Sequence, residues 1–191
     1  MQLLIPLLLY GFLPADQMGR LEGALTIVML GALIGSLGLG EALVQNRQVT
    51  EIHFNSSFWT CLVVGCTITL LLIAGASQIG HLLLWPNPNE LQSVLVPLSL
   101  LIPLASVSGI FRARLSRKLL FRPMAVAEIV SVLSYAVVVI ALLPRYGLWS
   151  PIAGAVVREA ALLVSLCISA RWFPRLSCSF ASLKELVSFG L

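Results

Sequence analysis

Charged side chains are scarce in this sequence. Asp, Glu, Lys and Arg together make up 10% of the 191 residues, apolar residues make up 59%, and the mean hydropathy is +0.99. Because soluble globular domains carry roughly 25% charged residues, this composition excludes a water-soluble domain. Long apolar runs between short polar turns instead predict an all-α, polytopic transmembrane helix bundle that forms one membrane-embedded unit.

Signatures of common enzyme chemistry are also missing. The sequence holds no glycine-rich phosphate loop followed by Lys-Ser/Thr, no hydrolase-like carboxylate pair and no metal-ligand cluster. The four cysteines, Cys61, Cys66, Cys167 and Cys178, lack redox or metal spacing, so we interpret them as buried thiols. We therefore expect no enzyme, no cofactor and no metal. The net charge of +4 is interpreted as a membrane-orientation signal rather than as a sign of a nucleic-acid partner.

The apolar stretches predict about six spans. Their approximate ranges are 3–13, 21–44, 57–84, 91–111, 123–143 and 149–170. The first is too short for a span, which needs about 20 residues, so we expect it to be the second half of a helix. Residues 171–191 predict a cytoplasmic connector and, from the capping box at Ser182, the start of a further helix. The sequence thus predicts one lobe, residues 1–191, cut at both ends.

Five of the twelve Lys/Arg residues gather in one short stretch, namely Arg112, Arg114, Arg117, Lys118 and Arg122. Each Arg or Lys at the centre of a membrane helix costs roughly 2.5–3.5 kcal/mol. The stretch therefore predicts a cytoplasmic basic loop between two spans. With this loop inside, nine basic residues lie on inside segments and two on outside turns. We interpret the loop as a topology anchor that contacts anionic membrane lipid, with capture of a lipid-linked substrate as the alternative.

Two spans carry residues that alter helix geometry. Gly31 and Gly35 form a GxxxG spacing, which predicts close helix packing or, alternatively, a helix that bends or slides during transport. Pro97 and Pro103 predict kinks in the fourth span.

Several short patterns follow one another along most of the chain. Leu-Pro-x-Asp-x-x-Gly begins at Leu13, Gly-Leu-Gly-x-Ala-Leu-Val-Gln ends at Gln45, and Thr-Glu-x-His begins at Thr50. Phe-Arg-Ala-Arg-Leu-x-Arg then begins at Phe111, and Ala-Glu-Ile contains Glu128. In this order and spacing the chain resembles the N-terminal half of Wzx-type polysaccharide and O-antigen flippases, which belong to the multidrug/oligosaccharidyl-lipid/polysaccharide exporter superfamily.

The resemblance implies one lobe of a two-lobe transporter in the bacterial cytoplasmic (inner) membrane. Such proteins move lipid-diphosphate-linked oligosaccharide, for surface polysaccharides such as lipopolysaccharide, by alternating access. The implied partners are membrane lipid, the lipid-linked oligosaccharide and a C-terminal lobe that this sequence does not contain. A multidrug exporter of the same superfamily and a non-transporting scaffold of a glycan-assembly complex are the alternatives.

Ionisable residues within spans are the default functional candidates in a membrane protein. Arg158 lies near the middle of the last predicted span, and its guanidinium could bind a diphosphate head group bidentately. The competing interpretation is a structural ion pair with Glu128 or Glu41. These two glutamates lie near the cytoplasmic ends of their spans and are weaker substrate-binding candidates.

Overall fold

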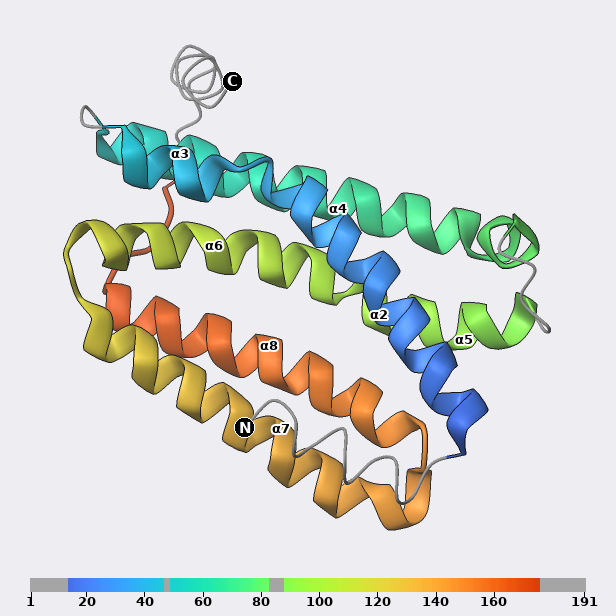
Figure 1. Ribbon diagram of the computed structural model, residues 1–191. Coiled ribbons are helices and arrows are strands. Elements are labelled where there is room, and N and C mark those ends of the chain that lie inside the picture. The colour runs from blue at the N-terminus through green and yellow to red at the C-terminus, as the bar shows by residue number, and fades with distance from the viewer. Residues whose placement is uncertain (1–13, 47–48, 83–87, 176–191) are drawn as a thin grey trace.

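The computed structural model describes residues 14–46, 49–82 and 88–175 (Figure 1). Within these ranges the regular structure consists of seven helices, with no strand. They are α2 (Ala15–Ser36), α3 (Leu39–Gln45), α4 (Glu51–Leu82), α5 (Pro88–Ser99), α6 (Leu101–Arg117), α7 (Phe121–Tyr146) and α8 (Trp149–Ala170). The span expected over residues 3–13 and the helix expected from Ser182 lie outside the described residues.

Five stretches of the described chain are long and apolar enough to cross a membrane. They are Gln17–Ser36, Glu51–Gln78, Leu91–Arg117, Phe121–Tyr146 and Trp149–Ala170. Their outward faces carry large apolar side chains such as Leu33, Leu70 and Ile140, each more than 60% exposed. Lipid rather than water suits such surfaces. The predicted all-α transmembrane bundle is therefore confirmed.

Helix α6 lies at the centre of the bundle, between α4 on one side and α8 on the other (Figure 1). Helix α2 crosses both α4 and α6, and α7 packs along the length of α8. The central position of α6 explains its fully buried residues Ile102, Ile110 and Leu115, which contribute to the two core clusters. Buried aliphatic side chains on successive turns of one helix are the pattern expected of a helix surrounded by others.

Two of the expected spans are interrupted, so each consists of two helices. The single helix expected over residues 21–44 is corrected: α2 ends at Ser36, and Leu37 and Gly38 have φ values of 50° and 63° before α3 begins. This left-handed conformation is unstrained for glycine but not for leucine. The fourth span is likewise divided at Leu100, between α5 with its internal Pro97 and α6. Residues 14–20, which the expected ranges leave between the first two spans, belong largely to the first part of α2.

Small residues allow the three crossing helices to approach one another closely. A Cβ atom added at Gly35 would lie 2.6 Å from Ser106 Oγ on α6, and one at Gly31 would lie 2.9 Å from Ile102 Cδ1. On α4, a Cβ atom at Gly65 would lie 3.0 Å from the Cα atom of Pro103. The GxxxG pair therefore serves close helix packing, whereas the bend in this region lies just beyond it.

Candidate functional site

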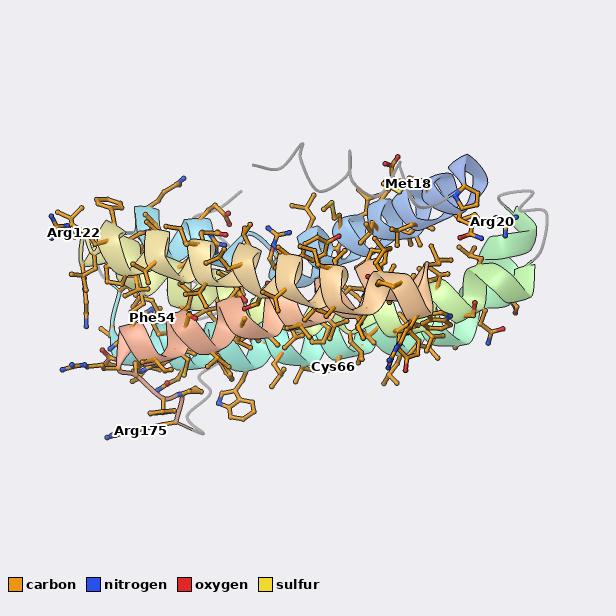
Figure 2. All side chains as sticks on the ribbon, turned by 90° about the horizontal axis from the view of Figure 1, so that it is seen from below. Met18, Arg20, Phe54, Cys66, Arg122 and Arg175 are labelled. Atoms are coloured by element: carbon orange, nitrogen blue, oxygen red, sulfur yellow. The ribbon has the colours of Figure 1, made fainter. Side chains whose placement is uncertain are left out.

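The chain order brings most described basic residues to one end of the bundle. Helices α3, α6 and α8 end there, and α4 and α7 begin there (Figure 1). In Figure 2, Arg122 and Arg175 lie toward this end, whereas Arg20 lies toward the other. We call the first of these the basic end. The side-by-side placement follows from helices that cross in alternating directions and are joined by short turns.

The basic stretch predicted as a loop is mostly helical, which corrects that expectation. Arg112, Arg114 and Arg117 belong to α6, Arg122 belongs to α7, and Lys118 lies in the short turn between them. The helix continues because the apolar residues between the arginines, Ala113 and Leu115, are buried in the core. The arginine side chains are long enough to leave this apolar environment or to find partners within the bundle.

Arg112 forms an ion pair with Glu128 on α7, with the guanidinium Nη2 donating to the carboxylate. The two side chains are 38% and 39% exposed, so neither is sealed inside the bundle. This pairing leaves the alternative assignment of Glu128 as the partner of Arg158 without support, since Glu128 and Arg158 form no ion pair within the described chain. Two half-exposed opposite charges hold each other weakly enough to exchange partners.

A groove with a volume of about 350 Å³ adjoins this ion pair. It is lined by Gly40, Glu41, Val44, Gln45, Gly109, Arg112, Ala113, Ser116 and Met124. We call it the α3–α6–α7 groove after the helices that contribute these residues. Its two helices α3 and α6 approach closely, since a Cβ atom at Gly40 would lie 3.4 Å from the Gly109 carbonyl oxygen. Glu41 is exposed and Arg112 half-exposed, so the groove carries both signs of charge.

Arg158 and Glu159 lie near the middle of α8 but not among the residues that line the groove. The Nε atom of Arg158 is buried and has no hydrogen-bond partner among the described residues. Within the same residues, Arg158 and Glu41 form no ion pair. Glu159, by contrast, accepts a hydrogen bond of 3.2 Å from Ser108 Oγ on α6. Successive helical residues point roughly 100° apart, so these neighbours on α8 lie in different surroundings.

Arg114 has partners that the sequence did not indicate. It donates two hydrogen bonds, of 2.8 and 2.7 Å, to the two carboxylate oxygens of Glu51 on α4. Its guanidinium carbon also lies 5.1 Å from the ring centroid of Phe54 and 4.9 Å from that of Trp172. Trp172 follows α8 and packs edge-to-face against Phe54 and Phe111. Arg114 thus joins α4, α6 and the segment after α8.

Arg117 binds the end of α3. It donates a hydrogen bond of 2.7 Å to the carbonyl oxygen of Leu43 and another to that of Asn46. These carbonyls have no partner within a helix that stops at Gln45, and an arginine is well suited to satisfy them. Fewer of the five basic residues are therefore available for the predicted contact with lipid, because Arg112, Arg114 and Arg117 bind protein groups. Lys118 and Arg122 remain exposed.

These features define an integral, multi-pass membrane protein with a charged groove between its spans, an arrangement typical of transporters. A family model described as "Polysaccharide biosynthesis protein" matches residues 11–191. The chain belongs to this family.

A curated relative is the succinoglycan biosynthesis transport protein ExoT of Rhizobium meliloti (strain 1021), which is 32% identical over 184 residues. The alignment covers 94% of this chain and 36% of the relative, so the chain spans about a third of that protein's length. No solved structure matches the chain. The resemblance to polysaccharide exporters of the flippase type is therefore confirmed for this part of the protein.

Proposed function

We propose that this chain is the N-terminal lobe of a transporter that moves lipid-diphosphate-linked oligosaccharide across the bacterial inner membrane by alternating access. A second lobe would complete the cavity, because substrate sites in repeat-built transporters lie between repeats. The family match supports a transport role rather than an enzymatic one. The observation that carries the proposal is the α3–α6–α7 groove, where Arg112 offers a half-exposed guanidinium within an apolar span.

The ion pair of Arg112 with Glu128 suggests how an anionic substrate is taken up. A diphosphate carries more charge than a carboxylate and accepts two parallel hydrogen bonds from a guanidinium. It can therefore displace Glu128 from Arg112, since both side chains are partly exposed. Glu41, on the opposite wall of the groove, would disfavour a second anion and so limit the residence of the bound group.

Arg158 is proposed as a second contact for the same head group, farther from the basic end. The unsatisfied Nε–H of Arg158 is a donor available to a substrate oxygen during passage. Buried donors without a partner are unusual in folded proteins, and an ionisable residue inside a span is by default a candidate for function.

The test is export of surface polysaccharide in the bacterium that carries the gene, with Arg112→Gln and Arg158→Gln introduced into the complete protein. Loss of a hydrogen-bonded charge at a phosphate contact removes roughly 1.5–3 kcal/mol, so we expect export to fall about 10- to 100-fold. Lipid-linked oligosaccharide should accumulate in the cytoplasmic leaflet while the amount of protein in the membrane is unchanged. Arg145→Gln is the matched control, because Arg145 lies at the opposite end of α7 and outside the groove.

Unchanged export by both variants, at equal protein abundance, would overturn the head-group assignment. Purified protein in liposomes extends the test to the function itself. Flipping of a lipid-diphosphate sugar supports the proposal. Transport of organic cations instead, or recovery of assembly partners without any flux, would replace it with an exporter of drugs or with a scaffold.

A further inference from the structure

A second pocket lies at the basic end, on the side of α4 and the segment that follows α8. Its volume is about 770 Å³, and it is lined by Glu51, Ile52, Asn55, Arg114, Arg171, Trp172, Phe173, Pro174 and Arg175. We call it the connector pocket. It shares no lining residue with the α3–α6–α7 groove. Its walls come from the first turns of α4, one side chain of α6 and residues 171–175.

The backbone of the segment after α8 is fixed against α4. Trp59 Nε1 donates a hydrogen bond of 3.0 Å to the Arg175 carbonyl, and the Arg175 amide donates one of 3.1 Å to Asn55 Oδ1. Between these bonds and α8, Trp172 is 9% exposed, and its ring packs against those of Phe54, Phe58 and Phe111. The pocket is therefore held in shape before any ligand enters, which reduces the entropic cost of binding.

The charges around the connector pocket do not balance. Three arginines face one carboxylate, and both oxygens of Glu51 are already used by Arg114. Arg171 and Arg175 are exposed and form no ion pair with any described residue. Arg114 itself is 8% exposed, and its Nε–H has no hydrogen-bond partner among the described residues. The pocket thus offers an excess of two positive charges and one buried donor that lacks an acceptor.

An exposed aromatic side chain stands beside these charges. Phe173 is 76% exposed, and it follows the last residue of the spanning helix α8 by three positions. Aromatic side chains concentrate where hydrocarbon meets head groups, and basic pockets at that level bind lipid phosphates. Guanidinium groups bind phosphate through paired hydrogen bonds that ammonium groups cannot reproduce.

We propose that the connector pocket binds a phosphate-bearing anion through Arg171 and Arg175, with the Arg114 side chain in its wall. An anionic phospholipid head group at the membrane surface and a free diphosphate present the same chemistry to these residues. The site is separate from the groove assigned to transport. Its occupation would fasten the segment after α8 more firmly to the start of α4.

The test measures binding to the purified protein in neutral detergent. The probes are a short-chain phosphatidylglycerol, used below its micelle concentration, and inorganic pyrophosphate. The double variant Arg171→Gln/Arg175→Gln removes two charges without removing the backbone bonds of Arg175. At about fivefold in affinity per basic residue, we expect binding to weaken about 30-fold. The control pair Arg20→Gln/Arg145→Gln removes two charges at the opposite end of the bundle, outside the pocket, and should change affinity less than twofold.

A gain-of-binding variant protects the test against a simple folding defect. Ile52→Lys adds a positive charge at a half-exposed position of the pocket lining and leaves the Arg114–Glu51 pair intact, so it should raise affinity about fivefold. Binding of phosphatidylglycerol assigns a lipid occupant, and binding of pyrophosphate alone assigns a soluble one. Absence of binding by both probes would overturn the proposal. Equal losses of affinity in the pocket double variant and the control double variant would also overturn it, because they would indicate general electrostatic attraction to the protein surface.

Discussion

The Arg114–Glu51 ion pair should be energetically asymmetric. The Arg114 side chain is 10% exposed and the Glu51 side chain 63% exposed. Glu51→Ala strands a buried cation, which typically costs about 3–5 kcal/mol of unfolding free energy. Arg114→Met leaves behind a carboxylate that water can reach, and methionine retains much of the buried volume. Glu51→Ala, at the exposed partner, should therefore lower the unfolding free energy more than Arg114→Met, at the buried partner.

The magnitude for Arg114→Met follows from the lost contacts. Two cation–π contacts, to Phe54 and Trp172, contribute roughly 0.5–1 kcal/mol each, and an ion pair with an exposed carboxylate adds about 0.2–1 kcal/mol. The expected loss is about 1–3 kcal/mol. In the double variant Glu51→Ala/Arg114→Met no buried charge is stranded, so its stability should equal that of Arg114→Met alone.

Unfolding can be followed by the reactivity of one cysteine. Cys61 is 0% exposed, so a thiol reagent labels it only after the bundle opens. The background protein carries serine at the other three cysteines, and sodium dodecyl sulfate is titrated into protein held in mild detergent micelles. Equal destabilisation by the two single variants, or additive effects in the double variant, would refute the reasoning that burial sets the asymmetry.

Two further predictions concern helix packing and the end of α3. Gly35→Ala should destabilise the bundle by about 1–3 kcal/mol in the same titration, because the new Cβ would lie 2.6 Å from Ser106 Oγ. Gly19→Ala, which meets nothing within 4 Å, should be neutral or stabilising by up to about 1 kcal/mol, and a Gly35 variant no worse than this control would contradict the packing. Arg117→Met should speed hydrogen exchange of the α3 amides about tenfold by freeing its terminal carbonyls. The exposed neighbour Lys118→Met should leave that exchange unchanged, and equal rates in the two variants would show that Arg117 does not hold α3.

Hydropathy predicts much of the fold, because helices in lipid share one requirement. A helix that crosses hydrocarbon must be apolar over most of its length, and α8 (Trp149–Ala170) accordingly has the range expected from its apolar run. The interruption between α2 and α3 at Leu37 and Gly38 could not be predicted from hydropathy. Both halves of that span are apolar, so hydropathy does not separate them, and Leu37 has a left-handed φ that is unfavourable for leucine.

The candidate site was only partly accessible. Arg158, Glu128 and Glu41 were singled out because ionisable residues within spans are unusual, and that reasoning needs no structure. The partner of each charge could not be inferred, since it depends on which helices are neighbours. Glu51 and Arg114 lie 63 positions apart, and no periodicity in the sequence relates them. The exposed Arg171 and Arg175 received no role for the same reason.

The attachment of Arg175 to α4 has a consequence for biogenesis. Its partner Trp59 lies 116 residues earlier in the chain. At the ~5–20 residues per second of protein synthesis, Trp59 is made about 6–23 s before Arg175. During this interval the indole N–H of Trp59 must be satisfied by lipid head groups, water or the insertion machinery. Closure of this contact therefore marks a late step in assembly of the lobe, after α8 has been inserted.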